Sequence, residues 1–220
     1  MTAYIPSHAP PPTLFTPTTV YSLAATVALL IVAQQAARAL LPPATYSHTR
    51  KRITWIWLAY DALIHFILEG SFIFYSFPRP RTVNTGSGPL AALWREYALA
   101  DTRWGVSDSG IVAVELLTVF GAGPCALWCC ELMRRGDGAA SYWIVVLSVA
   151  ELYGGWMTFA PEWLTSSPSL NTSHWLYTYV YLLFFNGLWV VVPLWLLWEA
   201  YGEIVGAVRA QAVLKEGKRA

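Results

Sequence analysis

Five long apolar stretches dominate this sequence and limit the folds available to it. Each is long enough to cross a bilayer, which takes about 20 mostly apolar residues. We expect them at Val20–Leu41, Ile53–Phe77, Gly110–Met133, Tyr142–Trp163 and Trp175–Tyr201. Because lipid offers no partner to backbone polar groups, such segments form helices that pair these groups internally. The sequence therefore predicts an all-α integral membrane protein, a five-helix bundle.

The composition supports a lipid environment. Hydrophobic residues make up 56% of the chain and charged residues 12%, against about 25% charged residues in an average globular protein. A water-soluble domain would have too few polar groups to cover its surface. The 12 tryptophans and 12 tyrosines suit membrane–water interfaces. A net charge of +1 gives no electrostatic footprint for nucleic acid, so we expect no nucleic-acid partner.

The chain divides by composition into three parts. Residues 1–19 form a Pro-rich leader without Lys or Arg, residues 20–205 the five-span membrane domain, and residues 206–220 a basic tail. Basic residues also flank the first and third connections, so the positive-inside rule places these connections and the tail in the cytoplasm. The N-terminus is then expected on the opposite side. Four arginines in the second connection oppose this orientation: Arg79, Arg81, Arg95 and Arg103.

Ionisable residues inside the apolar spans are the main functional signal. Each costs at least roughly 2.5 kcal/mol near the centre of a membrane helix. In the second span, Asp61, His65 and Glu69 follow one another at four-residue intervals. Residues with this spacing share one stripe of a helix. A histidine one turn from a carboxyl group suits proton transfer near neutral pH.

Three other spans add polar groups that can face the same interior. They are Glu115 and Thr118 in the third span, Glu151 in the fourth, and Asn186 and Trp189 in the fifth. The alternative role of such groups is to hold helices together by hydrogen bonds. For Asp61 and Glu151 the two readings stay equally open, whereas His65, Glu69 and Glu115 together favour proton transfer.

The sequence predicts no metal site and no disulfide. The second candidate histidine ligand, His174, lies at the end of a span. Cys125, Cys129 and Cys130 fall in one apolar run, as expected of buried thiols that pack as small hydrophobic groups. The sequon at Asn171 lies close to two spans, and we expect it to remain unmodified.

Four sequence blocks together resemble the emopamil-binding protein family over roughly residues 55–205. They are I-H-F-I-L-E-G at Ile64–Gly70, L-W-R-E-Y-A-L-A-D-T-R-W at Leu93–Trp104, V-E-L-L-T at Val114–Thr118 and F-N-G-L-W-V-V-V-P at Phe185–Pro193. His174 precedes the last block at a matching separation. The resemblance implies a five-helix protein of the EXPERA type in the endoplasmic-reticulum membrane, with a lumenal N-terminus and a cytoplasmic C-terminus.

The resemblance also implies an activity, that of a 3-beta-hydroxysteroid delta-8, delta-7 isomerase without a cofactor. Carried over residue by residue, His65 and Glu69 match the proton-donating end of the site, and Glu115 matches the carboxylate that removes a proton. Asn186 matches a residue that orients the carboxyl groups, and Trp189 the aromatic that faces the carbocation. Further residues are expected to bind the substrate: Asp61, Thr118, Trp104, Tyr153 and His174.

One departure from the family leaves the substrate open. The family often has Y-G-D in the fourth span, where this chain has Tyr153-Gly154-Gly155. A sterol is the first candidate substrate, and another polycyclic terpenoid the second. A third alternative is a protein that binds sterols or amines without catalysis. Cationic amphiphilic amines are expected ligands in any case, because they mimic a carbocation. The oligomeric state is left open, a homodimer included.

Overall fold

The computed structural model describes residues 15–218, which are almost entirely helical. Within this part of the chain, five helical segments are long and apolar enough to cross a membrane. The prediction of an all-α, five-span membrane bundle is therefore confirmed. Residues 1–14 of the predicted leader lie outside the described residues.

Four of the five spans begin and end close to the predicted positions, whereas the fifth, predicted to end at Tyr201, continues as a helix to Gly217. The first is α1 (Pro17–Leu40), and the fourth is α9 (Ala139–Leu164). Each other span combines α-helix with a π-helical segment. These are α3 (Thr49–Leu63), η1 (Ile64–Glu69) and α4 (Gly70–Ser76) in the second; α7 (Ser109–Leu117), η3 (Thr118–Ala122) and α8 (Gly123–Arg135) in the third; η4 (Leu176–Phe185) and α10 (Asn186–Gly217) in the fifth.

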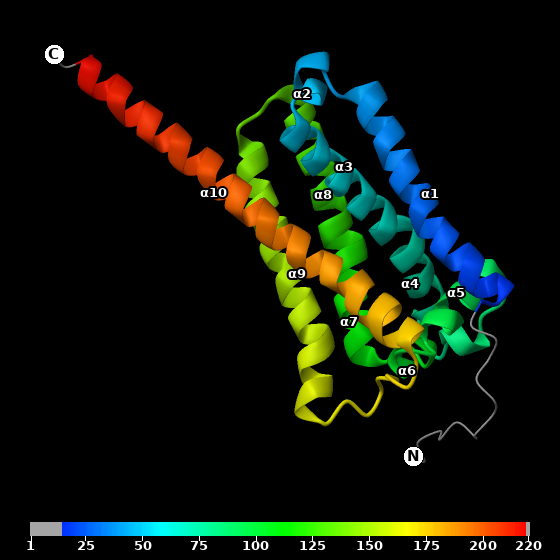
Figure 1. Cartoon of the computed structure of the whole chain (residues 1–220). Helices are drawn as coiled ribbons and strands as arrows, with labels where there is room; N and C mark the ends of the chain where they lie inside the picture. Colours follow the sequence, from blue (N-terminus) through cyan, green and yellow to red (C-terminus); the bar gives the residue numbers. More distant parts are fainter. Residues whose placement is uncertain (1–14, 219–220) are drawn as a thin grey trace.

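The spans pack in a defined order of neighbours. Helix α3 lies between α1 and α8, α8 packs on α9, and α9 packs on α10 along much of its length (Figure 1). The second span is the most buried of the five. It therefore places its side chains in the interior of the bundle, where neighbouring spans can reach them.

The fifth span is longer than a bilayer requires. With η4 and α10 it covers 42 residues, about 63 Å at 1.5 Å per residue, against a hydrocarbon core of about 30 Å. The C-terminal half of α10 projects beyond the other helices (Figure 1). The described part of the predicted basic tail continues this helix.

The π-helical segments are the main departure from regular helix geometry. Such segments widen the helix by one residue and leave a carbonyl group free. The Leu68 carbonyl in η1 accepts a hydrogen bond from the Trp94 indole, 3.2 Å away. Pro124 lies in the first turn of α8, directly after η3. Pro193 lies inside α10.

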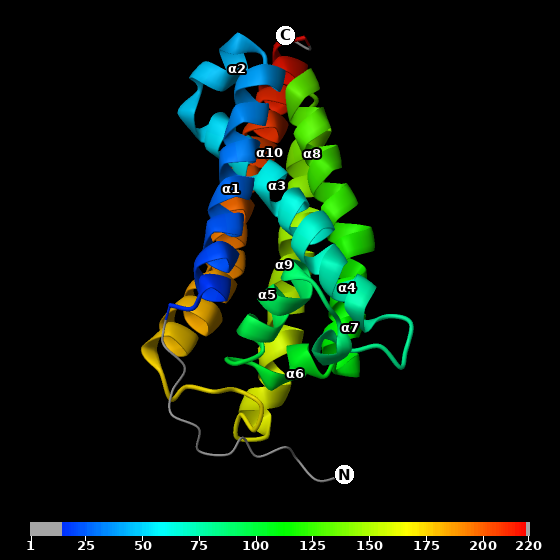
Figure 2. The ribbon, with the colours of Figure 1, turned by 90° about the vertical axis from the view of Figure 1, so that its right-hand side faces the viewer.

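The second connection folds back over one end of the bundle. It contains α5 (Pro89–Tyr97) and α6 (Thr102–Gly105), which lie at the opposite end from α2 (Pro43–Ser47) (Figure 2). The Trp94 and Trp104 rings stack with 4.8 Å between centroids and an interplanar angle of 2°. This aromatic packing covers the end of the second span at which η1 gives way to α4.

An ion-pair cluster fixes this connection to the fourth span. Arg103 lies 2.6 Å from an Asp101 oxygen and 3.6 Å from Glu162, and it donates to the Thr158 carbonyl at 2.7 Å. Both carboxylates are buried. Burial alone would lower the pKa of Arg103, but the hydrogen bond and charge of Asp101 raise it, so the guanidinium stays charged.

Substituting Arg103→Ala is expected to destabilise the protein strongly. The change leaves two buried carboxylates without their cation, at a cost of about 3–5 kcal/mol in the free energy of unfolding. Thermal unfolding in detergent micelles measures the effect. Arg81→Ala is the matched control, because Arg81 is exposed and makes only a cation–π contact with Phe74. Equal melting temperatures for the two variants would contradict the structural role of Arg103.

Candidate functional site

His65 lies between two carboxyl groups on its own span. Its Nδ1 atom is 2.5 Å from Glu69 Oε2, and its Nε2 atom is 3.1 Å from Asp61 Oδ1. The His65 side chain is only 2% exposed. The four-residue spacing places all three groups on the inner stripe of the helix, and η1 contains both His65 and Glu69.

The two carboxyl groups differ in exposure. Asp61 is fully buried, whereas the Glu69 side chain keeps 14% of its surface exposed. Glu69 is therefore the member of this set that a bound molecule can reach directly. Asp61, which the sequence analysis expects to contact substrate, lies behind the imidazole.

Trp189 approaches from the fifth span and binds Asp61. Its indole N–H donates to Asp61 Oδ1 at 2.7 Å. The Trp189 ring packs on Trp57, with 5.3 Å between centroids, and lies 6.3 Å from the Tyr60 ring. The family resemblance implies that the Trp189 ring faces a carbocation. In the structure, the indole N–H of the same side chain also restrains Asp61 through a hydrogen bond.

Glu115 reaches Glu69 from the third span. It is buried, and it lies one turn before η3, which packs against the η1 segment that contains Glu69. Thr118 donates to Glu115 Oε2 at 3.1 Å and opens the η3 segment. Two carboxyl groups form a hydrogen bond only if one of them carries a proton. The pair can therefore hold and exchange a proton.

Glu151 lies close to Asp61 and His65, although the predicted site set omits it. One ligand-type atom from each of these three residues falls within 4.8 Å of the other two. In the described chain, neither Glu151 carboxyl oxygen has a hydrogen-bond partner. The three groups have the chemistry to hold a divalent cation as well as a proton. The signal in the sequence is an acid near the middle of an apolar span.

Asn186 has different partners from those the sequence analysis expects. Its amide donates to the Tyr97 hydroxyl at 3.0 Å and to the carbonyls of Tyr181 and Leu182 at 3.0 and 2.8 Å. These carbonyls belong to the π-helical end of η4, which explains why they need an external donor. Burial raises the pKa of the Tyr97 hydroxyl. Asn186 thus ties the fifth span to α5.

Three predicted substrate-binding residues lie outside this cluster. Trp104 is buried between aromatic rings of the second connection. Tyr153 is 64% exposed on the outer face of α9. His174 Nδ1 accepts a hydrogen bond from the Leu176 backbone at the start of the fifth span. Trp104 and His174 support elements that surround the site, and Tyr153 faces outward.

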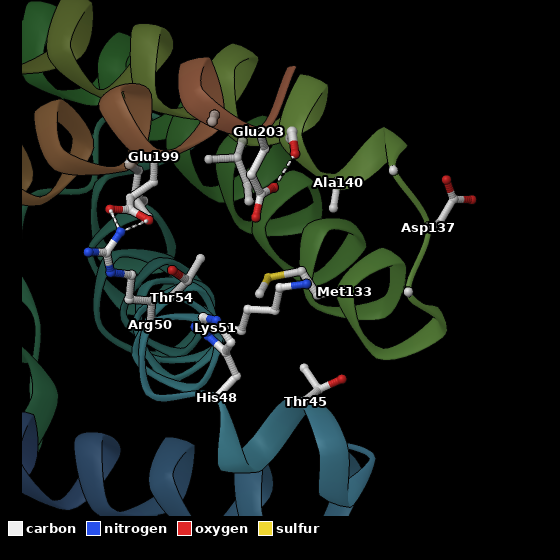
Figure 3. Close-up of a pocket in the computed structure, with 16 residues that line it drawn as sticks. Thr45, His48, Arg50, Lys51, Thr54, Met133, Asp137, Ala140, Glu199 and Glu203 are labelled. Carbon is white, nitrogen blue, oxygen red and sulfur yellow. Dashed lines mark hydrogen bonds and ion pairs between the residues drawn. The ribbon is translucent and has the colours of Figure 1, made fainter. Parts of the chain in front are cut away.

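A polar cavity of about 210 Å³ occurs elsewhere, at the end of the bundle near α2. Lys51 and Arg50 line it from α3, and Glu199 and Glu203 from α10 (Figure 3). Thr54, the lining residue of α3 that is nearest to His65 in sequence, precedes it by about 16 Å along the helix axis. This cavity is separate from the cluster around His65.

We expect Asn186 and Tyr97 to be energetically coupled. A double-mutant cycle with Asn186→Ala and Tyr97→Phe, measured by thermal unfolding, should give a coupling energy of about 1 kcal/mol for the hydrogen bond they share. The same cycle with Glu115→Gln is the control and should give a value near zero. Stronger coupling of Asn186 to Glu115 than to Tyr97 would contradict the contacts described above.

Comparison with known proteins shows a family and several curated relatives. The family EXPERA (EXPanded EBP superfamily) matches residues 89–200. The 3-beta-hydroxysteroid-Delta(8),Delta(7)-isomerase of Cavia porcellus is 29% identical, with 74% of this chain and 69% of the relative covered. The enzyme of the same name from Rattus norvegicus is 30% identical, with 72% and 67% covered.

A plant relative carries a different name. The protoglabretal synthase of Ailanthus altissima is 26% identical, with 71% of this chain and 69% of the relative covered. The matched region of the family contains Glu115, Glu151, Asn186 and Trp189. This chain belongs to the EXPERA (expanded EBP) superfamily of membrane proteins.

Proposed function

We propose that this protein is a sterol isomerase that moves a ring double bond from the delta-8 to the delta-7 position. The observation that carries the proposal is the buried His65–Glu69 pair with the Glu115 carboxyl group beside it. This arrangement supplies a proton donor and a proton acceptor within one apolar interior. The relatives named 3-beta-hydroxysteroid-Delta(8),Delta(7)-isomerase support the choice of substrate.

The reaction requires one proton to be added and one to be removed. The His65–Glu69 pair gives a proton to the alkene, whose π electrons form the new C–H bond and leave a carbocation on the adjacent carbon. Glu115 then takes a proton from the neighbouring ring carbon, and the electrons of that C–H bond form the new double bond. Transfer of the abstracted proton from Glu115 to Glu69 restores the donor side, so each turnover is balanced.

The surroundings suit a short-lived carbocation. Water would trap the cation, and an apolar interior between membrane helices excludes it. The Trp189 face and the nearby carboxylates lower the energy of a positive charge without a covalent bond. The same anionic interior accounts for the expected binding of cationic amphiphilic amines, which carry a permanent charge where the substrate develops one.

The proposed substrate and the membrane spans together indicate where the protein lies in the cell. A sterol substrate and a multi-pass bundle fit the endoplasmic-reticulum membrane. The basic segments favour a lumenal N-terminus and a cytoplasmic C-terminus. A homodimer is compatible with the apolar outer faces of the spans, which also face lipid.

A second candidate keeps the chemistry and changes the substrate to another polycyclic terpenoid. Two observations favour it. A Cβ atom at Gly155, where the family often carries an acid, would have open space around it, and one relative is named protoglabretal synthase. A panel of delta-8 sterols and non-sterol polycycles, incubated with the purified protein, separates the two substrates.

Glu115→Gln and Glu69→Gln are each expected to abolish most turnover while leaving the fold intact. The amide keeps the shape of the carboxyl group but cannot exchange a proton, so we expect a loss of about 10²–10⁴-fold. Complementation of cells that lack their own delta-8, delta-7 isomerase, with sterols read by mass spectrometry, measures conversion.

Glu131→Gln is the matched control, because Glu131 pairs with Arg134 and Arg135 at the C-terminal end of α8, away from the His65 cluster. It should convert sterol like the wild type. A well-expressed wild type without conversion would overturn the sterol proposal and leave the second substrate class or a non-catalytic binding role. Full conversion by Glu115→Gln would overturn the assignment of Glu115.

A further inference from the structure

The far side of His65 holds a second pair of carboxyl groups that the reaction above does not use. Asp61 is fully buried, and Glu151 is 7% exposed. In the described chain, Asp61 Oδ2, His65 Nε2 and both Glu151 oxygens have no hydrogen-bond partner. One carboxyl oxygen of Asp61, from the second span, lies within 4.8 Å of one carboxyl oxygen of Glu151, from the fourth, and of a His65 ring nitrogen.

The count of charges requires protons in this cluster. In the part of the chain that the structure describes, Asp61, Glu69 and Glu151 lie close to one basic group, His65, and the buried Glu115 adds a fourth acid from the third span. If all four acids were ionised, even a charged imidazole would leave a large net negative charge in an apolar interior. Uncompensated charges of this kind strongly destabilise the folded protein. A proton held between facing carboxyl groups removes charge and also supplies the missing hydrogen bond.

We propose that Glu151 is a positioning residue that shares a proton with Asp61 and thereby sets the acidity of His65. The inference rests on the proposed isomerase function and extends it to a residue that does not touch the substrate. The shared proton spreads the negative charge of Asp61 over two carboxyl groups. Asp61 then attracts the proton on His65 Nε2 less strongly, and the imidazole remains a better acid toward Glu69 on its Nδ1 side.

The Trp189 indole fixes the geometry of this pair. It donates to Asp61 Oδ1, the same oxygen that faces His65 Nε2. The other oxygen, Asp61 Oδ2, has no partner in the described chain. We assign the shared proton to this oxygen, since Oδ1 already has His65 and Trp189 as neighbours. No proton is consumed, because the shared proton stays in the pair through the reaction.

Two Glu151 variants of similar volume test the role in catalysis. Glu151→Gln keeps an N–H donor for Asp61, so kcat should stay within about threefold of the wild type, whereas Glu151→Leu removes the donor and should lower kcat about tenfold or more. KM should change less than about twofold in both, because Glu151 does not contact substrate. Wild-type kcat for Glu151→Leu would overturn the proposal. Equal losses in the two variants would also overturn it. Catalysis would then require a carboxyl group at position 151 that transfers its proton, and the hydrogen-bond donor that Gln retains would not be sufficient.

Infrared spectroscopy tests the shared proton without reference to activity. The difference spectrum between wild type and Glu151→Gln, recorded with a chelator present, should show the loss of one protonated carboxyl C=O band. Glu131→Gln is the control and should lose only an ionised carboxylate band, because Glu131 is paired with two arginines. If no protonated band is lost, or if metal analysis finds one tightly bound divalent cation removed by Glu151→Gln, the proposal is wrong. If the band is lost but the wild type converts no substrate, the proton pair stands and the isomerase proposal fails.

Discussion

The burial of His65 among carboxyl groups is the constraint on which the rest of the structure depends. A single imidazole contacts Asp61 on one nitrogen and Glu69 on the other, inside an apolar interior where each unpaired charge is costly. Such a cluster is stable only if neighbouring spans supply donors, acceptors or protons at fixed positions. Trp189, Thr118 and the packing of the third and fourth spans against the second meet this requirement.

The π-helical segments show how the bundle positions these groups. One contains His65 and Glu69, one begins at Thr118, three residues after Glu115, and one ends just before Asn186. Irregular helix geometry within a membrane needs outside partners for the freed carbonyls. Trp94 and Asn186 supply them. The second connection, which carries Trp94 and Tyr97, is therefore part of the support for the site as well as a covering for it.

Helix periodicity made much of this arrangement predictable. The five apolar stretches give the spans, and the four-residue spacing of Asp61, His65 and Glu69 gives their shared face. Periodicity within one helix does not say how that helix is rotated in the bundle, so it could not decide which of Glu151 and Tyr153, two residues apart, faces the interior. Glu151 faces the cluster and Tyr153 faces outward. Likewise, the partner of Asn186 depends on the fold of an irregular connection that no sequence period describes.

A single-turnover experiment tests the central claim that the buried His65–Glu69 pair supplies the proton. The purified protein is equilibrated in D₂O, mixed with less than one equivalent of a delta-8 sterol and quenched, and the product is analysed by mass spectrometry. The account predicts one deuterium in the delta-7 product, on the protonated ring carbon, because exchangeable hydrogen on the pair becomes the new C–H bond. A delta-7 product without deuterium would contradict it, because the hydrogen would then come from the substrate itself.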